Sequence, residues 1–169
     1  MLRNDRPRWM CRSGGVVLES LLALPVLVAV FFASVEYGIV LVTRSTITQA
    51  AAVGVREAGK GVDILLVRDA VNTILAANSI AITDSDNTAG SGKKIILEDS
   101  TGVVGWLGDP NLVYVPPNTL AAGEVRVTVW ILFSAKKTDG VTRVINAFND
   151  FGFSLNGKGF RVSSLVKKE

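Results

Sequence analysis

The residues of this chain whose types and spacing could do chemistry are two glycines and a glutamate near the N-terminus. Gly14 and Gly15 end a basic segment, and Glu19 stands just before an apolar run. A cut between Gly14 and Gly15 would leave a new α-amine on Gly15 and make Glu19 the fifth residue of the shortened chain. A carboxylate costs free energy in the centre of a bilayer and less near its edge, and a nearby cation would neutralise it. A cut at this place would thus create a cation that could neutralise Glu19, although Glu19 could also simply reach the lipid headgroups.

The apolar run after Glu19 is long enough to cross a membrane. Residues 20–35 carry no charge, and residues 20–42 contain one acid, Glu36. Roughly 20 helical residues cross the ~30 Å hydrocarbon layer of a bilayer. A secretory signal peptide has an apolar run of ~7–15 residues that ends in small residues before its cleavage site. The run here is longer and has no such ending, which favours a membrane anchor.

The charges before and after this run predict its orientation. The whole chain has a net charge of +3, and residues 1–14 alone account for it, with four arginines against Asp5. Only Arg44 and Arg56 follow the run closely. Because basic residues stay on the cytoplasmic side, we expect a cytoplasmic N-terminus and an extracytoplasmic domain. The rest of the chain is charge-balanced, which argues against a nucleic-acid partner.

Several features follow one another in order over residues 12–58. They are the basic leader ending in Gly14, Glu19, Leu24-Pro25 inside the apolar run, Glu36-Tyr37-Gly38 at its far end, and the run TQAAAVGVR at 48–56. The first two resemble the processing site of type IV pilins. Together, the features resemble the TadE family of pseudopilins from the tight-adherence (Flp) pilus assembly system. The chain departs from that family at Ser20, where an aromatic residue usually stands.

This resemblance implies a minor pseudopilin in the bacterial cytoplasmic (inner) membrane. A prepilin peptidase would mature it on the cytoplasmic face, removing the leader of residues 1–14. Its helix would then contact other pseudopilins and the major pilin in a hetero-oligomeric assembly. In that assembly Glu19 would neutralise the α-amine of its own or a neighbouring Gly15.

The anchor is expected to continue as one long helix over residues 15–58. Its 44 residues would extend about 66 Å at ~1.5 Å per residue, so the part outside the lipid would project as a stalk. Pro25 lacks an amide donor and should bend the helix. Ala50, Gly54 and Ala58 recur at every fourth position and form a small-residue face that another helix can approach closely. That helix could belong to the chain's own domain or to a partner.

Residues 59–169 are predicted to form a small α+β domain with an antiparallel sheet. Helical periodicity predicts an amphipathic helix over 63–78. Alternating apolar residues predict strands at 80–83, 95–98, 103–107, 112–115 and 124–134, and a hairpin of 151–155 and 158–166. A short helix or turn is expected over 141–148. The predicted fold class is thus a pilin-like, long N-terminal transmembrane helix followed by a small α+β domain.

The composition argues against an enzyme. The chain has no histidine, and its one cysteine, Cys11, lies in the leader. These absences exclude Ser-His-Asp and Cys-His catalysis and the common zinc sites. The segment 90–93 (GSGK) lacks the spacing of a P-loop. Asp84, Asp86 and Thr88 are spaced as in a calcium loop, but Ile95 stands where its glutamate is needed. We therefore expect no catalysis, no cofactor and no metal.

Two other interpretations stay open at this point. The chain could be an uncleaved single-pass membrane protein whose extracytoplasmic domain binds a ligand or serves in adhesion. It could also be an anchored enzyme that uses carboxylates alone. The mass of the mature N-terminus separates the first alternative from a pseudopilin, and a pocket with converging carboxylates would mark the second.

Overall fold

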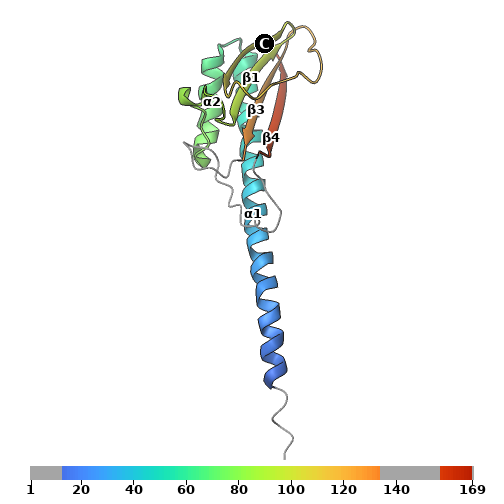
Figure 1. Cartoon of the computed structure of the whole chain (residues 1–169). Coiled ribbons are helices and arrows are strands. Elements are labelled where there is room, and N and C mark those ends of the chain that lie inside the picture. Colours follow the sequence, from blue (N-terminus) through green and yellow to red (C-terminus); the bar gives the residue numbers. More distant parts are fainter. Residues whose placement is uncertain (1–12, 134–156, 169) are drawn as a thin grey trace, which may run out of the picture.

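In a computed structural model, which describes residues 13–133 and 157–168, one long helix carries a small domain at its C-terminal end (Figure 1). The helices are α1 (Ser13–Gly59) and α2 (Ile64–Leu75), with short 3-10 turns η1 (Ala76–Asn78) and η2 (Asp84–Asp86). The strands are β1 (Lys93–Asp99), β2 (Gly102–Gly108), β3 (Glu124–Leu132) and β4 (Gly159–Lys167). The predicted architecture, a long apolar helix followed by an α+β domain with an antiparallel sheet, is confirmed.

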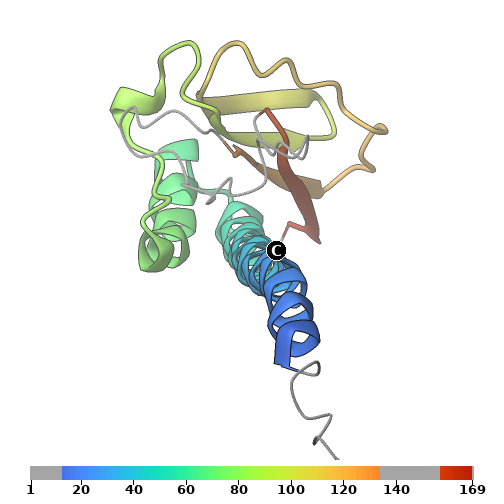
Figure 2. The same ribbon diagram turned by 60° about the horizontal axis from the view of Figure 1, so that its bottom comes forward.

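All neighbouring strands of the sheet are antiparallel, in the order β2-β1-β3-β4. Because side chains alternate along a strand, each strand has an inner face toward the helices and an outer face away from them. Figure 2 shows both helices on one side of the sheet. The inner face contributes most of the core, which includes Ile95, Leu97, Val125, Val127, Val129 and Ile131.

The C-terminal part of α1 belongs to this core. Ile47, Ala50, Ala51, Val55 and Ala58 are all buried, and this part of the helix packs on α2, β3 and β4. The sequence predicted a stalk that ends at residue 58 and a separate domain after it. In the structure, the end of the anchor helix also packs into the domain core, where it covers the sheet together with α2.

Helix α2 packs beside α1 as the periodicity predicted. Val67, Val71 and Leu75 are fully buried on one side of it, while Leu65 and Leu66 are exposed. Gly61, with φ of 76°, forms the tight turn between the two helices. The predicted helix over 63–78 thus consists of α2 and the single turn η1.

Two predicted strands are wrong. Residues 80–83 form an extended segment without a strand partner in the described residues, because the Asn72 side chain binds both polar groups of Ile82: Nδ2 donates to its carbonyl over 2.7 Å, and Oδ1 accepts its N–H over 2.8 Å. Residues 112–115 lie in a loop over the outer face, held where Lys94 Nζ donates to the Leu112 carbonyl over 2.7 Å. The segments predicted at 141–148 and 151–155 lie outside the described residues.

The loop between β2 and β3 covers the outer face of the sheet. Tyr114 donates its hydroxyl to Glu98 and lies 3.3 Å from the Thr128 hydroxyl. Asn118 accepts a hydrogen bond from Arg126. As a result, polar side chains on both central strands are buried, with Glu98, Arg126 and Thr128 each less than 5% exposed.

Candidate functional site

The exposed part of α1 is the candidate functional site, and Glu19 lies one turn after Gly15 on it. Helix α1 begins at Ser13, so Gly14 and Gly15 both lie in its first turn. Residues four apart are neighbours on a helix surface, with Cβ atoms about 5–6 Å apart. Side chains also lean toward the N-terminus of a helix, which directs the exposed Glu19 toward the turn of Gly15. A carboxylate at this spacing could reach an amine on Gly15.

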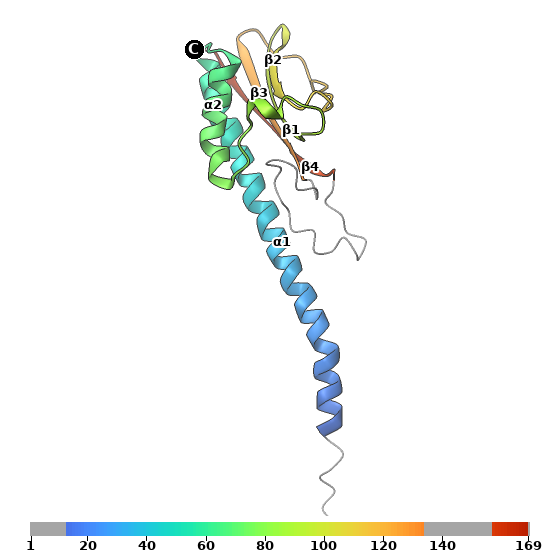
Figure 3. The ribbon, with the colours of Figure 1, turned by 60° about the vertical axis from the view of Figure 1, so that its left-hand side comes forward.

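The residues that follow Glu19 form an apolar surface with no covering in the described structure. Leu22, Leu27 and Phe31 are each between 64% and 68% exposed. Within residues 13–133 and 157–168, Gly15–Gly59 is the one helix that is long and apolar enough to cross a membrane. Figure 3 shows this part of α1 extending well beyond the domain. An apolar surface of this length is stable in lipid and unfavourable in water, which indicates a single-pass membrane protein.

The length of the helix indicates at which residue a membrane span would end. From Val16, 20 residues at ~1.5 Å each give about 30 Å, the hydrocarbon thickness, and end at Val35. The first buried residue, Thr43, follows after seven further residues, or about 10 Å. A span that starts at Val16 would thus bring the domain to within about 10 Å of the hydrocarbon layer. Glu36 is half-buried and lies on the helix stripe that continues through Val40 and Thr43 into the core.

The predicted kink residue lies inside an unbroken helix. Pro25 is within α1, which continues through it without a change of helix type. The hydroxyls of Ser20 and Ser34 donate to the carbonyls four residues earlier, Val16 and Val30, over 2.9 and 2.8 Å. These serines therefore satisfy their polar groups within the helix, as lipid requires. A bend at Pro25 stays a prediction.

The small-residue face packs against the chain's own domain. Ala50 and Ala58 are buried against the core, and a Cβ atom placed on Gly54 would lie 2.6 Å from Val71 Cγ2 and 3.3 Å from Val127 Cγ1. Of the two possibilities that the sequence left open, the structure shows packing within the chain: the helix that approaches this face is α2.

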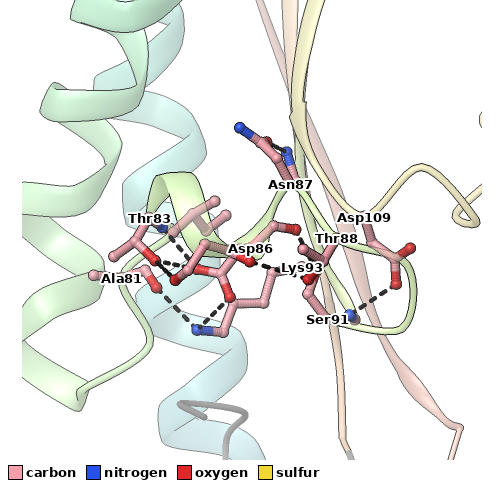
Figure 4. A network of polar contacts seen from close by, with 12 residues as sticks. Ala81, Thr83, Asp86, Asn87, Thr88, Ser91, Lys93 and Asp109 are labelled. Atoms are coloured by element: carbon pink, nitrogen blue, oxygen red, sulfur yellow. Dashed lines mark hydrogen bonds and ion pairs between the residues drawn. The ribbon is translucent and has the colours of Figure 1, made fainter.

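A polar network stabilises the segment 84–88, whose spacing is similar to that of a calcium loop (Figure 4). The Asp86 carboxylate accepts hydrogen bonds from the N–H and the hydroxyl of Thr83, and Lys93 Nζ lies 3.6 Å from it. Lys93 also donates to the Ala81 carbonyl over 2.9 Å. The carboxylate is thus neutralised by a buried lysine of the same chain, and no group of three metal-ligating residues occurs in the described part of the chain.

Asp109 organises the glycine-rich turn that precedes β1. Its Oδ2 accepts the N–H groups of Gly90 and Gly92 over 3.0 and 2.9 Å. Its Oδ1 accepts the N–H of Asn111 over 2.9 Å. A buried carboxylate therefore holds residues 90–92, the segment that leads into β1.

The sequence analysis missed an ion pair on the outer face. Glu98 Oε2 and Arg126 Nη1 are 3.6 Å apart, and their side chains are 2% and 5% exposed. The hydroxyl of Tyr114 has a raised pKa, first because it is buried and then because it donates to Glu98. Nothing in the spacing along the chain could have indicated this pair, since the strand positions alternate as ordinary solvent-facing residues do. The loop that buries them comes from a different part of the chain.

Beside this pair, the turn from β1 to β2 and the loop before β3 enclose an open hollow of about 440 Å³. Its walls include Glu98, Asp99, Pro116, Asn118 and Leu120. Glu98 is paired with Arg126, and Asp99 accepts hydrogen bonds from the N–H and hydroxyl of Thr101. Both carboxylates therefore have partners within the described residues.

Comparison with known proteins finds a family match over the anchor helix. The family model described as "TadE-like protein" matches residues 14–56, which is most of α1 and none of the sheet. No curated protein and no solved structure matches the chain. The predicted resemblance to TadE-like proteins is confirmed over the anchor helix, and it indicates involvement in tight-adherence pilus assembly.

Proposed function

We propose that this chain is a minor pseudopilin of a tight-adherence pilus assembly machine. The observation that carries the proposal is the exposed apolar helix, with Glu19 one turn after Gly15 and the domain packed on its far end. The protein acts structurally: its helix packs among other pseudopilins and the major pilin within the membrane. This function needs no catalytic residue, cofactor or metal.

Processing precedes assembly in this proposal. A prepilin peptidase cuts between Gly14 and Gly15 at the cytoplasmic face, and the remaining chain stays anchored with its domain outside the cytoplasm. The basic leader, with four arginines among its first fourteen residues, supports this orientation. The α-amine that is formed then lies at the start of α1, within one turn of Glu19.

The mass of the membrane-extracted chain tests this proposal. Co-expression with a prepilin peptidase should shorten the chain by its first fourteen residues, and Gly14→Arg should prevent the shortening. Gly38→Ala is a matched control, because a Cβ on Gly38 meets nothing within 4 Å. An unchanged mass in the presence of an active peptidase would instead support the uncleaved single-pass receptor or adhesion protein. A reporter joined after Glu169 should be active only outside the cytoplasm.

A further inference from the structure

Lys93 and Asp86 form an ion pair that is almost completely removed from solvent. Their side chains are 3% and 6% exposed, and Lys93 Nζ lies 3.6 Å from Asp86 Oδ1. Lys93 is paired with the core residue Ile131 in the register of β1 and β3, so its side chain starts on the inner face of the sheet. Two charges in such a place have lost their hydration, and their attraction offsets that loss only when further hydrogen bonds satisfy both groups.

The hydrogen bonds around the pair fit two separate ions poorly. A lysine ammonium has three N–H donors, and among the described residues Lys93 Nζ donates to the Ala81 carbonyl over 2.9 Å. Its contact with Asp86 Oδ1, at 3.6 Å, is too long for a hydrogen bond. Asp86 Oδ2, in contrast, accepts the N–H and the hydroxyl of Thr83 over 2.7 and 2.9 Å. The surroundings thus offer one acceptor to the nitrogen and two donors to a single oxygen.

A single neutral amide would use all of these contacts. An amide that joined Lys93 Nζ to Asp86 Cγ would have one N–H, which could keep the Ala81 carbonyl as its acceptor. Its carbonyl oxygen, Oδ2, could keep both donors of Thr83. A buried polar group is stable when it is hydrogen-bonded, whereas a buried charge is costly. The geometry in Figure 4, with Nζ between the Ala81 carbonyl and the Asp86 carboxylate, therefore suits an amide better than an ion pair.

We propose that Lys93 and Asp86 condense to an intramolecular isopeptide bond in the folded chain. The ammonium passes a proton to Oδ1, the resulting amine attacks Cγ, and negative charge collects on Oδ2. Oδ1 then takes a second proton from the attacking nitrogen and leaves as water. One ammonium and one carboxylate thus become one amide and one water, no oxidant or cofactor is consumed, and no charge stays in the interior.

The residues around Asp86 favour this reaction in two ways. Groups held at about 3–3.5 Å react as if they were highly concentrated, and Nζ already lies 3.6 Å from the carboxylate. The two donors of Thr83 lie at the distances from Oδ2 at which donors stabilise a developing oxyanion. Ser91 donates its hydroxyl to the main-chain carbonyl of Asp86 over 2.6 Å, which holds the residue from its other side.

The bond joins the turn η2 covalently to the start of β1. The sequence contains one cysteine, so no disulfide can connect two parts of it, and an isopeptide bond is a covalent link that needs no cysteine. It closes a ring over residues 86–93. The reaction requires only the folded domain and neither cleavage of the leader nor a partner, so this inference and the proposed function can fail independently.

Peptide mass mapping of the full-length chain tests the bond without any variant. Trypsin cuts after lysine and arginine, so an unlinked chain gives the peptide 69–93 at its full mass. A linked Lys93 is not cut, and the product is the peptide 69–94 with the mass of one water missing. A cyclic imide at Asp86 would also lose a water, but trypsin would still cut after Lys93. Recovery of the peptide 69–93, with or without its water, as the main product would overturn the proposal.

Two exposed ion pairs of the same chain are internal controls. Lys168 Nζ lies 3.7 Å from Asp99 Oδ2, with side chains 44% and 20% exposed. Lys60 Nζ lies 2.6 Å from Glu57 Oε1, with side chains 54% and 34% exposed. Because water stabilises these charges, both pairs should keep their full mass. Loss of water at either pair would show that the mass change does not depend on burial, and the proposed mechanism would be withdrawn.

Two variants test the roles of the nucleophile and of the oxyanion donors. Lys93→Arg keeps the cation but lacks the amine, so its peptide 69–93 should have full mass; a missing water there would contradict the assignment of the bond to Lys93. Thr83→Val keeps the N–H and removes the hydroxyl. In a pulse–chase experiment it should form the bond on the order of a hundredfold more slowly, as for the loss of one oxyanion donor. An unchanged rate in this variant, with tryptophan fluorescence like that of the parent chain, would overturn the mechanism.

Discussion

Gly54 and Val71 lie so close together that a Cβ atom on the glycine would be 2.6 Å from Val71 Cγ2. This contact joins the anchor helix to α2 at the centre of the core. A glycine is unfavourable in a helix interior by about 1 kcal/mol relative to alanine, so its presence here reflects the space that it saves. The same contact packs the anchor helix directly against the domain.

Gly54→Val should therefore destabilise the domain, by about 1–3 kcal/mol for overpacking. Gly54→Ala should cost less, because the gain in helix propensity offsets part of the clash. Urea unfolding of the detergent-solubilised chain, followed by the fluorescence of its tryptophans, measures both variants. Gly38→Ala serves as the control, since a Cβ at that position meets nothing within 4 Å. Equal stability of all the variants would show that α2 does not pack on α1 as described.

The buried Glu98–Arg126 pair predicts a strongly non-additive response. Glu98→Gln or Arg126→Met alone should lower the free energy of unfolding by about 3–5 kcal/mol, because each leaves an uncompensated buried charge. The double variant should recover most of that loss. Thermal unfolding of the four proteins in a double-mutant cycle measures the coupling. Additive losses would mean that the two charges do not interact across their 3.6 Å separation.

These two contacts show where sequence reasoning succeeds and where it stops. The alternation of Val125, Val127, Val129 and Ile131 was sufficient to predict β3, because one covered face of a sheet leaves a period of two in the sequence. The same alternation at Ile80 and Ile82 predicted a strand that does not form. There the residues do alternate into the core, but the side chain of Asn72 occupies the backbone groups that a neighbouring strand would use.

The other features that the sequence could not predict depend on burial by segments that are distant along the chain. Glu98 and Arg126 alternate with core residues as solvent-facing positions do, and their burial depends on a loop that is distant in sequence. The small residues of α1 indicated close packing but not the partner, which is α2 of the same chain. The roles of Gly14, Gly15 and Glu19 stay predictions, which rest on a spacing that is local to one helical turn.

Stability at acidic pH should depend on Asp99. Its pKa is held below the usual value of 3.8, first by the hydroxyl and then by the N–H of Thr101. A carboxyl with a depressed pKa in the folded state stabilises the protein above its unfolded pKa, and this contribution is lost as the pH falls through the folded pKa. Asp99→Asn should therefore be less stable than the parent chain at pH 6, and the difference should vanish at a pH well below 3.8. Thermal unfolding across this range measures it, and a difference independent of pH would show that ionisation of Asp99 contributes nothing.

Glu19 carries the most specific consequence of the proposed function. If its carboxylate pairs with the α-amine of a neighbouring Gly15, Glu19→Ala leaves a cation unpaired in lipid. Such a loss costs on the order of 3–5 kcal/mol, which is a hundredfold or more in association at ~1.4 kcal/mol per factor of ten. The variant should still insert and be cleaved, because neither step needs the neighbour, but it should not co-purify with its pilin partners. Glu19→Gln should fail nearly as badly, since it keeps the shape and loses the charge.

Ser20→Ala is the matched control for this experiment. Ser20 is exposed beside Glu19, and its hydroxyl donates to the Val16 carbonyl of its own helix. Removing it deletes no charge and leaves no polar group of another chain unpaired, so co-purification should persist. If Glu19→Ala and Glu19→Gln co-purified as well as Ser20→Ala, the carboxylate would not be an assembly contact. Glu19 would then only reach the lipid headgroups. The proposed cut at Gly14–Gly15 could no longer be explained by a charge pair between Glu19 and the new α-amine.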